Sequence, residues 1–575
     1  MRHNALFFAL LPLGIIGSVI AGCSADAGSS TTGEEASTAQ SGSCRVLDFQ
    51  TGKLADLSKD HSPFAKLVLN KAAVKFKASN GKDAKCPTTI HEVLSAFDAI
   101  PNTSRQIFGV DETGDLPQQS DGGHRFVIAQ TTAQSGGTDA DVLLAPLEAE
   151  PGKLDTESLE VISFDPDRGA NVFYKFMSGR WNIIGNGSQI DPQKSQDTKA
   201  AAGQFFCQGC HQTGALNFKE RQIPWNNWNG FFQMPGFSTK DPLIAGWMKN
   251  ATGTVADGVT VDPKEPAMGN AYELQGLIEA GNKRLVEVRV KKVLAGGGTG
   301  FPGQSLKTLV RELMCDVGEV NLVSSQAHSR LSSPGDAAVP ATILADEQLA
   351  RTVEGANASP PSLTLASYGK AIAKQSIDGV TGAKDAMFAL FSPERSFTSE
   401  LVGDTLVDQG WLTKEALADI LMTDFPNPVF SKQRCALAAT IPDVAPAAQG
   451  STQWISAWAT ALQGSSLAGA KGLAKRLSTN GELAAQGAQV SDLFAKCNAR
   501  ATSEADKLAV DIVSLVAQRR VELRADEHLN RGNRGFPQII ESSALLPITS
   551  LPAARGALSL QPDCTLGSSP AAIDE

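Results

Sequence analysis

The sequence predicts an α+β protein, with an antiparallel, β-rich N-terminal part and a large, mostly α-helical domain after it. From about residue 120 to residue 187, apolar and polar residues alternate with a period of two, which is typical of half-buried strands. From residue 263 onward the chain is rich in Ala and Leu, and its apolar residues recur at helical spacing. A length of 575 residues allows roughly two to four domains with substantial cores.

The β-rich part is expected to be a meander of five strands joined by tight turns. The turn Asp165–Gly169 joins the third strand to the fourth, and Met177–Gly179 joins the fourth to the fifth. Upstream of them, Thr89 and Glu92 have the spacing of a capping box that opens a short helix. The expected strands are Arg125–Gln130, Val142–Leu147, Leu159–Phe164, Ala170–Phe176 and Arg180–Ile184.

Glycine and proline clusters at 296–303, 333–340 and 356–361 are expected to separate the helices of the second part. Ser503 and Asp506 have the spacing of another capping box. Behind it, an apolar stripe predicts a helix with one buried face. The stripe consists of Leu508, Ile512, Leu515 and Val516.

The pentapeptide Cys207-Gln208-Gly209-Cys210-His211 is the signature by which a c-type haem is attached. Two thiols at this spacing can bond to the two vinyl groups on one edge of the porphyrin, and the next residue places an imidazole under the ring as the proximal iron ligand. A redox dithiol or half of a zinc site is the alternative. A zinc site needs four ligands, and the chain has no second Cys-x-x-Cys pair. The motif predicts one covalent haem c on Cys207 and Cys210, with His211 as the iron ligand.

The sixth iron position has several candidates. Met234-Pro235-Gly236-Phe237 resembles the Met-Pro-x-Phe segment that bears the axial Met in class I c-type cytochromes, although it follows His211 more closely than in that family. The resemblance implies that Met234 binds the iron, and a thioether ligand raises the reduction potential. A sixth iron position without a protein ligand is also an alternative. The other candidates are Met248, Met268, His124 and His328.

An aromatic cluster follows the motif on a chain in which only 6% of residues are aromatic. Beside a porphyrin, such a cluster would form a low-dielectric wall and raise the potential. Asn226 and Asn227 would then lie close to a propionate, whereas an ordinary hydrophobic core contact is the alternative. The cluster consists of Trp225, Trp228, Phe231 and Phe232.

The N-terminus has the pattern of an export signal. Arg2 and His3 precede the apolar run Ala5–Ala21, which is too short for a stable membrane span. Ile20-Ala21-Gly22-Cys23 resembles the lipobox of bacterial lipoproteins, which implies cleavage before Cys23 and lipid chains on that residue. Ser24 in the next position resembles the default signal for the outer membrane. We expect an exported protein, lipid-anchored in the bacterial cell envelope at the outer membrane and facing the periplasm; an ordinary signal peptide is the alternative.

The nine cysteines divide into one for lipid, two for haem and six others. Six in an oxidising compartment allow three disulfides, for which fifteen pairings exist. We favour Cys44–Cys86, within one domain, and Cys435–Cys497, within one helical stretch; buried thiols are the alternative. The six are Cys44, Cys86, Cys315, Cys435, Cys497 and Cys564.

The segment Gly298–Ser305 has the glycine and serine spacing of a phosphate-binding loop, but Gln304 stands in place of the lysine that grips the phosphates. We interpret it as a loop between helices. No Gly-x-Ser-x-Gly elbow is present, and no carboxylate pair stands out. No catalytic constellation is therefore recognisable outside the haem segment, which favours an electron carrier over an enzyme.

The meander that ends in Cys-x-x-Cys-His resembles the β-sheet mono-haem cytochromes of the c-prime-beta kind, and the chain as a whole resembles a c-type cytochrome. This resemblance implies electron transfer in the envelope. The net charge of −10 suits a basic redox partner and argues against nucleic acid. A haem enzyme or gas- or peroxide-binding protein with an open site, and an envelope scaffold with an accessory haem, are the alternatives. The expected organisation is 1–22 signal peptide, 23–42 disordered tether, 43–195 β-rich domain, 196–262 haem c-binding segment, 263–540 α-helical domain and 541–575 C-terminal tail.

Overall fold

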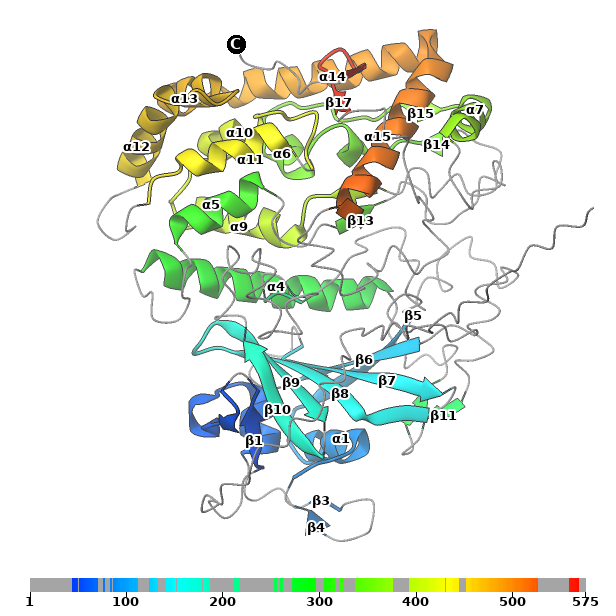
Figure 1. Ribbon diagram of the computed structural model, residues 1–575, viewed down its shortest axis with the longest axis vertical. Coiled ribbons are helices and arrows are strands. Elements are labelled where there is room, and N and C mark those ends of the chain that lie inside the picture. Colours follow the sequence, from blue (N-terminus) through cyan, green and yellow to red (C-terminus); the bar gives the residue numbers. More distant parts are fainter. Residues whose placement is uncertain are drawn as a thin grey trace, which may run out of the picture.

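The computed structural model arranges the chain in layers, with a β-sheet at one end, one long helix across it and a group of helices beyond (Figure 1). This arrangement confirms the α+β class. The structure describes residues 44–49, 51–70, 76–77, 83–84, 86–111, 124–132, 140–150, 153–177, 179–186, 211, 214–216, 253–255, 259–261, 271–295, 305–315, 321–323, 337–375, 392–429, 431–443, 451–525 and 558–567.

The sheet has eight strands in the order β2-β1-β10-β9-β8-β7-β6-β5. Neighbouring strands are antiparallel except for β1 and β10, which are parallel. The strands are β1 (Val46–Asp48), β2 (Lys53–Leu54), β5 (Ser104–Asp111), β6 (His124–Thr131), β7 (Val142–Glu150), β8 (Lys153–Asp165), β9 (Ala170–Met177) and β10 (Arg180–Asn186).

The five expected strands are confirmed as β6 to β10, but the sheet is larger than the predicted meander. Strands β1 and β2 have three and two residues, too few to display a period of two. They join the sheet through the non-local parallel pair of β1 and β10, in which Leu47 lies opposite Asn182. Strand β5 pairs along its whole length with β6, which places Ser104 opposite Thr131 and Asp111 opposite His124.

The alternation of side chains gives the sheet two buried faces. On one face, Val142, Val161 and Tyr174 pack against the N-terminal helical turns and helix α1 (Ile90–Asp98). The capping box predicted at the start of α1 is confirmed, because Thr89 and Glu92 each accept from the backbone N–H of the other. The N-terminal turns are η1 (Leu57–Lys59) and η2 (Ala65–Leu69), and the neighbouring strands are β3 (Phe76–Lys77) and β4 (Asp83–Ala84).

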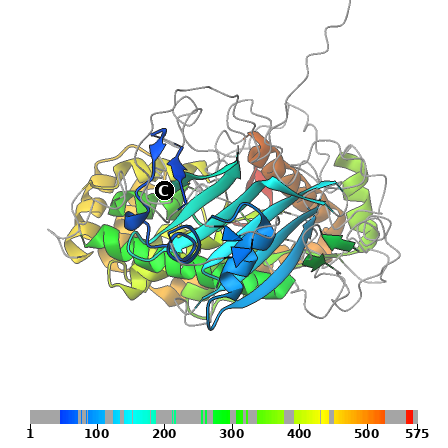
Figure 2. The same cartoon turned by 90° about the horizontal axis from the view of Figure 1, so that it is seen from below.

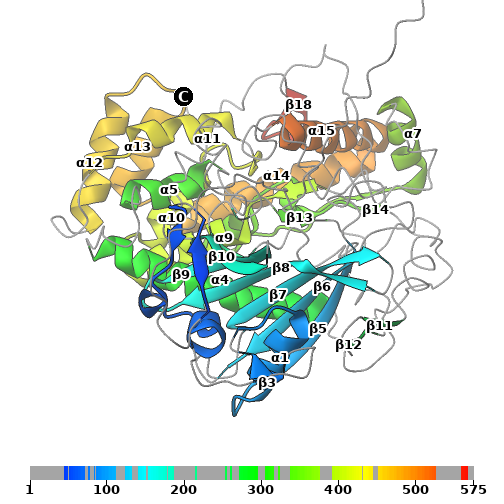
Figure 3. The same cartoon turned by 60° about the horizontal axis from the view of Figure 1, so that its bottom comes forward.

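The other face of the sheet is covered by helix α4 (Ala271–Leu294), which lies between the sheet and the remaining helices (Figures 1 and 3). Leu274 and Ile278 pack against the sheet, whereas Val286 and Val290 belong to the core of the helical region. Seen from the sheet side in Figure 2, α4 runs behind the strands. Because α4 is buried from both sides, it has no single apolar stripe of the kind that marks a surface helix.

The close approach of α4 to the sheet requires a glycine at the turn between β8 and β9. Gly169 has a φ of +68°, and a Cβ at this position would lie 2.4 Å from Cγ1 of Val288 on α4. Beside it, the Lys292 ammonium donates to the carbonyl of Asp167. The turn predicted over Asp165–Gly169 therefore forms, and it also makes direct contact with α4.

The helical region is built on a single core, to which each of the ten helices named below contributes buried apolar residues. Within the described ranges, no helix has the length and apolar character needed to cross a bilayer. The helices are α5 (Leu306–Met314), α6 (Glu347–Thr352), α7 (Leu365–Gln375), α9 (Phe397–Asp408), α10 (Lys414–Leu421), α11 (Lys432–Leu437), α12 (Ser451–Gln463), α13 (Ala470–Thr479), α14 (Leu483–Ser503) and α15 (Ala505–Ala525), with turns η8 (Ala341–Ile343) and η10 (Ala438–Thr440).

Short antiparallel strand pairs add β-structure beyond the large sheet. Two of them, β13–β16 and β14–β15, lie in the predicted helical domain 263–540, where pairs of two or three residues leave no periodic signal. The pairs are β11 (Gly253–Val255) with β12 (Val259–Val261), β13 (Asn321–Val323) with β16 (Ser392–Glu394), β14 (Ala337–Ala338) with β15 (Ser362–Leu363), and β17 (Ser559–Leu560) with β18 (Leu566–Gly567).

Helix α15 carries the predicted apolar stripe, and all four of its residues are buried. The capping box predicted at its start is wrong. Ser503 is the last residue of α14, and its hydroxyl donates to the carbonyl of Ala499. The Asp506 carboxylate instead accepts from the Ser367 hydroxyl and the Lys370 ammonium, which ties α15 to α7. The contact between two helices thus prevails over the local cap.

Three disulfides join the six cysteines that lie within the described residues. Cys44–Cys86 is the predicted pair, with 5.2 Å between its Cα atoms. The predicted pair Cys435–Cys497 is wrong, because Cys435 bonds to Cys315 and Cys497 bonds to Cys564. Helix α5 packs beside α11 and brings Cys315 to Cys435 across 120 residues, a proximity that the sequence does not reveal.

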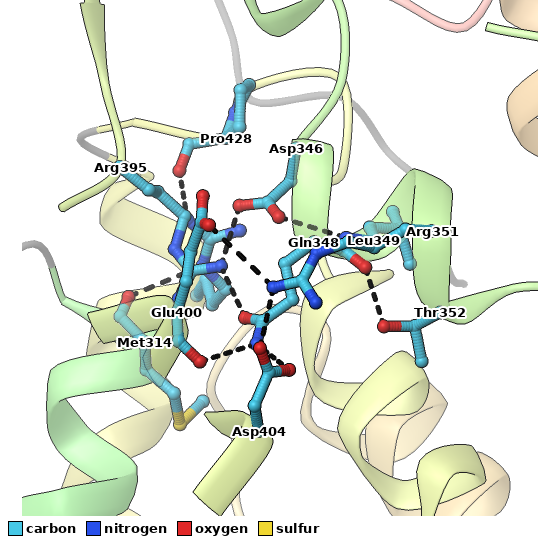
Figure 4. Close-up of polar contacts among 11 residues, drawn as sticks. Met314, Asp346, Gln348, Leu349, Arg351, Thr352, Arg395, Glu400, Asp404 and Pro428 are labelled. Atoms are coloured by element: carbon cyan, nitrogen blue, oxygen red, sulfur yellow. Dashed lines mark hydrogen bonds and ion pairs between the residues drawn. The ribbon is translucent and has the colours of Figure 1, made fainter. Parts of the chain in front are cut away.

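A buried polar network joins the loop before α6 to α9 (Figure 4). The Arg395 guanidinium donates to Asp346 at 2.7 Å and to Gln348 at 3.2 Å. The Gln348 amide donates in turn to the Glu400 carbonyl and the Asp404 carboxylate. Although burial opposes its ionisation, Asp346 has a lowered pKa, because Arg395 and Arg434 are close. These contacts bind one part of the helical core to another and pair the buried charges of Asp346 and Arg395.

A second buried ion pair joins α4 to the helical region. Arg289 of α4 donates to the carboxylate of Glu312 on α5 at 2.5 Å, and both side chains are almost fully buried. Burial raises the pKa of Glu312, and the charge of Arg289 opposes that rise. The pair fixes the rotation of α4 at the point where the helix meets the helical core.

We predict that Arg289→Met lowers the free energy of unfolding by about 3–5 kcal/mol, because Glu312 then stays buried without its cation. The double variant Arg289→Met/Glu312→Leu should regain most of this loss, since it leaves neither charge behind. Urea unfolding followed by tryptophan fluorescence measures both. Equal midpoints for the single and double variants would contradict the assignment.

Candidate functional site

The structure describes one residue of the predicted haem motif, His211, and the short segment Gly214–Leu216 that follows it. His124 lies in β6, opposite Asp111 of β5. The other sequence-predicted site residues lie outside the described ranges. They are Cys207 and Cys210 of the motif, Met234, Met248, Met268 and His328 as sixth ligands, Trp225, Trp228, Phe231 and Phe232 of the aromatic cluster, Asn226 and Asn227, and Cys23 at the lipobox.

The imidazole of His211 is held by the backbone just downstream of it. Its Nδ1 lies 2.7 Å from the carbonyl oxygen of Ala215. A carbonyl can only accept, so Nδ1 carries the proton and the neutral ring has its lone pair on Nε2. Metal-binding histidines almost always use one ring nitrogen in this way, because the hydrogen bond fixes the tautomer and the direction of the other nitrogen. The His211 ring therefore has the tautomer expected of a ligand that binds metal through Nε2.

A tight turn makes this contact possible. Gly214 has a φ of +74°, and its N–H donates to the carbonyl of His211 at 3.0 Å. A residue with a side chain would be strained in this conformation. The turn folds the chain back, so that the next carbonyl, that of Ala215, reaches the His211 ring.

The turn is clamped between the sheet and α4. From β9, the Asn171 amide donates to the carbonyl of Gly214 at 2.9 Å. From α4, the Asn282 amide oxygen accepts from the N–H of Leu216 at 2.7 Å, and its nitrogen donates to the Leu216 carbonyl at 3.0 Å. Both asparagines are buried, and Ala215 is fully buried. The backbone that orients His211 is thus fixed from both layers.

The His211 ring lies against the sheet. The centroid of its ring is 5.1 Å from that of Phe173, and the two planes meet at 41°. Phe173 is a buried residue of β9 and points to the same face as Asn171, two positions before it. The phenyl ring limits the access of water to one side of the imidazole and restricts its movement.

Charged groups anchor α4 beside this turn. Arg284 donates to the buried carboxylate of Asp141 at 3.0 Å, and its guanidinium lies 4.4 Å from the centroid of the Phe164 ring. Phe164 packs in turn against Ala215. Asp141 also accepts from the N–H and hydroxyl of Thr132, which lies at the end of β6. The ion pair therefore holds sheet and helix together next to the His211 segment.

Sequence reasoning missed Asn171, Phe173 and Asn282, which hold the His211 segment. Asn282 had a weak signal, since an asparagine inside a helix has poor helix propensity and needs a reason to be there. Asn171 and Phe173 occupy one face of a strand that was predicted, but nothing local indicates what that face contacts.

The six cysteines that the sequence leaves for disulfides all form them. All six cysteines within the described residues form disulfides with one another, so none of them is a partner for Cys207 or Cys210. In the ranges that the structure describes, no three metal-binding side chains gather into a group. A haem c would take at most two ligands from these ranges, His211 and the sixth-position candidate His124, so this result does not bear on it.

We compared the chain with models of protein families, with curated proteins and with solved structures, and none of the three comparisons found a match. The resemblance to the β-sheet cytochromes therefore remains a prediction. The case for a cofactor depends on the Cys207–His211 motif and on the geometry of His211.

Proposed function

We propose that the protein is a mono-haem c-type cytochrome that transfers electrons in the bacterial cell envelope, to which a lipid on Cys23 anchors it. Cys207 and Cys210 would hold one haem c, and His211 would bind its iron. The observation that carries the proposal is the hydrogen bond from Nδ1 of His211 to the Ala215 carbonyl. It presents Nε2 as the metal-binding atom in the one histidine that the motif assigns to iron.

When bound, the haem would supply a one-electron couple between ferric and ferrous iron. The protein's own residues would orient and insulate it. The Ala215 carbonyl keeps the His211 proton on Nδ1, and the clamped turn holds the ring in one direction whatever the charge of the iron. Phe173 excludes water from one side of the imidazole. A ligand that does not move between the two oxidation states suits electron transfer.

The cysteine pattern supports the proposal independently. Three disulfides indicate folding in an oxidising compartment, which is where bacteria attach haem c. Of the nine cysteines, only Cys23, Cys207 and Cys210 are not part of these bridges. They are the three to which the sequence assigns lipid and haem.

The charge of the chain bears on the redox partner. With 61 acidic and 51 basic residues, the protein carries a net charge of −10. We propose a basic partner in the envelope, which would be attracted at long range and bound weakly in a salt-sensitive way.

The first test is whether the protein carries covalently bound haem. The double variant Cys207→Ser/Cys210→Ser should lose all haem staining on a denaturing gel, because neither thioether bond can form, and each single variant retains at most one such bond. The matched control is Cys44→Ser/Cys86→Ser, which also removes two cysteines but breaks only a disulfide. It should still stain. Staining that survives in the first double variant would end the haem c assignment.

The sixth ligand decides between electron transfer and a haem enzyme or sensor. If Met234 binds the iron, ferrous protein should scarcely respond to carbon monoxide, and ferric protein should show a weak sulfur-to-iron charge-transfer band. Met234→Ala should abolish the band, lower the reduction potential and admit carbon monoxide, since a thioether stabilises ferrous iron. Met268→Ala is the matched control and should do none of these. Immediate carbon monoxide binding by the wild type would favour the enzyme or sensor instead.

The lipid anchor is tested by Cys23→Ser. The variant should leave the membrane fraction for the soluble fraction of the envelope, because lipid attachment starts at that thiol. Ser24→Ala, one residue later, keeps the thiol and should stay with the membrane. If Cys23→Ser and wild type partition alike, the lipobox interpretation is wrong.

A further inference from the structure

One peptide group links His211 to helix α4. The carbonyl of Ala215 accepts from Nδ1 of His211 at 2.7 Å. The N–H of Leu216 belongs to the same peptide group and donates to Oδ1 of Asn282 at 2.7 Å. Ala215, Leu216 and Asn282 are all buried, so the bond between Leu216 and Asn282 is shielded from water, and the bond at His211 is partly shielded. The two hydrogen bonds thus form a continuous chain from the imidazole to an asparagine 66 residues beyond Leu216.

Hydrogen bonds in such a chain strengthen one another. An acceptor on the N–H of an amide shifts electron density toward its carbonyl oxygen, and the oxygen becomes a better acceptor. A better acceptor at Nδ1 gives the imidazole more anionic character and makes Nε2 a stronger donor to a metal. A stronger donor favours ferric over ferrous iron and lowers the reduction potential.

We propose that Asn282 is a positioning residue that sets the reduction potential of the haem through the Ala215–Leu216 peptide. The inference rests on the proposed function, because it requires a haem on His211. It also gives α4 a role in the redox chemistry: the helix supplies the far end of the hydrogen-bond chain. The ion pairs of Arg284 with Asp141 and of Arg289 with Glu312 fix α4 against the sheet and the helical region.

Two substitutions at position 282 separate tuning from simple support. Asn282→Asp keeps an acceptor for the Leu216 N–H and makes it charged, hence stronger. Asn282→Leu removes the acceptor. Tuning predicts opposite changes: a lower potential for Asn282→Asp and a higher one for Asn282→Leu. If Asn282 only supported the turn, both variants would loosen it and shift the potential in the same direction.

Asn171 provides the matched controls, because it is also buried and also holds the turn, but it contacts the Gly214 carbonyl in the preceding peptide group. Asn171→Asp places a carboxylate in the same neighbourhood and also loses an amide donor, as Asn282→Asp does, but it does not touch the Leu216 N–H. It therefore measures the effect of the charge and the lost donor without that contact. Asn171→Leu measures the effect of a lost support. Both should move the potential less than the corresponding changes at Asn282.

The experiment is a spectroelectrochemical titration of the full-length protein with its attached haem. The iron–histidine stretching frequency is taken from resonance Raman spectra of the ferrous protein in the Met234→Ala background, because this band is seen only in five-coordinate haem. We expect the ferrous-to-ferric ratio at a fixed potential to rise about threefold to tenfold in Asn282→Leu, where tenfold equals about 59 mV for one electron. The ratio should fall in Asn282→Asp. The stretching frequency should fall in the first variant and rise in the second.

Shifts of the same sign at position 282, or equal shifts at positions 282 and 171, would overturn the inference. If Asn282→Leu does not fold, the two Asp variants are compared instead. Equal shifts of the potential in Asn282→Asp and Asn171→Asp would then overturn the inference. Haem staining distinguishes a failure of the proposed function from a failure of the role proposed for Asn282. A wild-type protein without covalent haem refutes the proposed function, whereas stained variants with unchanged potentials refute only the role of Asn282.

Discussion

The burial of α4 on both of its faces is the constraint on which the rest of the structure depends. Leu274 and Ile278 cover the sheet, and Val286 and Val290 enter the core of the helical region, so each layer has its apolar surface covered by the same helix. Burial of apolar area is the main favourable term in folding. Removing α4 would expose two cores at once, and neither layer would retain its partner.

Polar side chains on the two buried faces of such a helix are costly unless each has a partner, because water does not reach those faces. The three on α4 that matter most each find one in a different segment. Asn282 binds both polar groups of Leu216, Arg284 pairs with Asp141 of the sheet side, and Arg289 pairs with Glu312 of α5. These contacts allow one rotation and one longitudinal position of the helix. The apolar surfaces thus bring the layers together, and the polar contacts define their register.

The His211 segment benefits from this rigidity. Its turn lies between a strand and a helix that are themselves fixed, so the carbonyl that accepts from Nδ1 has little freedom to move. A binding site works best when the residues around the ligand are held by others. The large helical region carries no recognisable catalytic motif, but it fixes α4 from the side away from the sheet. We attribute to it this supporting role in the proposed cytochrome.

By itself, the sequence determined most of the features that depend on a few neighbouring residues, although the cap that it predicts at Ser503 is wrong. Alternation of apolar residues identified β6 to β10, the Thr89–Glu92 spacing identified the start of α1, and the Cys207–His211 motif pointed to a histidine whose tautomer the structure fixes. Only the tertiary structure decided which distant segments meet. Cys315 pairs with Cys435 across 120 residues, β1 joins β10, and Asn282 reaches Leu216. The physical reason is that a local pattern depends on the geometry of one helix or strand, whereas these pairings depend on how the layers pack around α4.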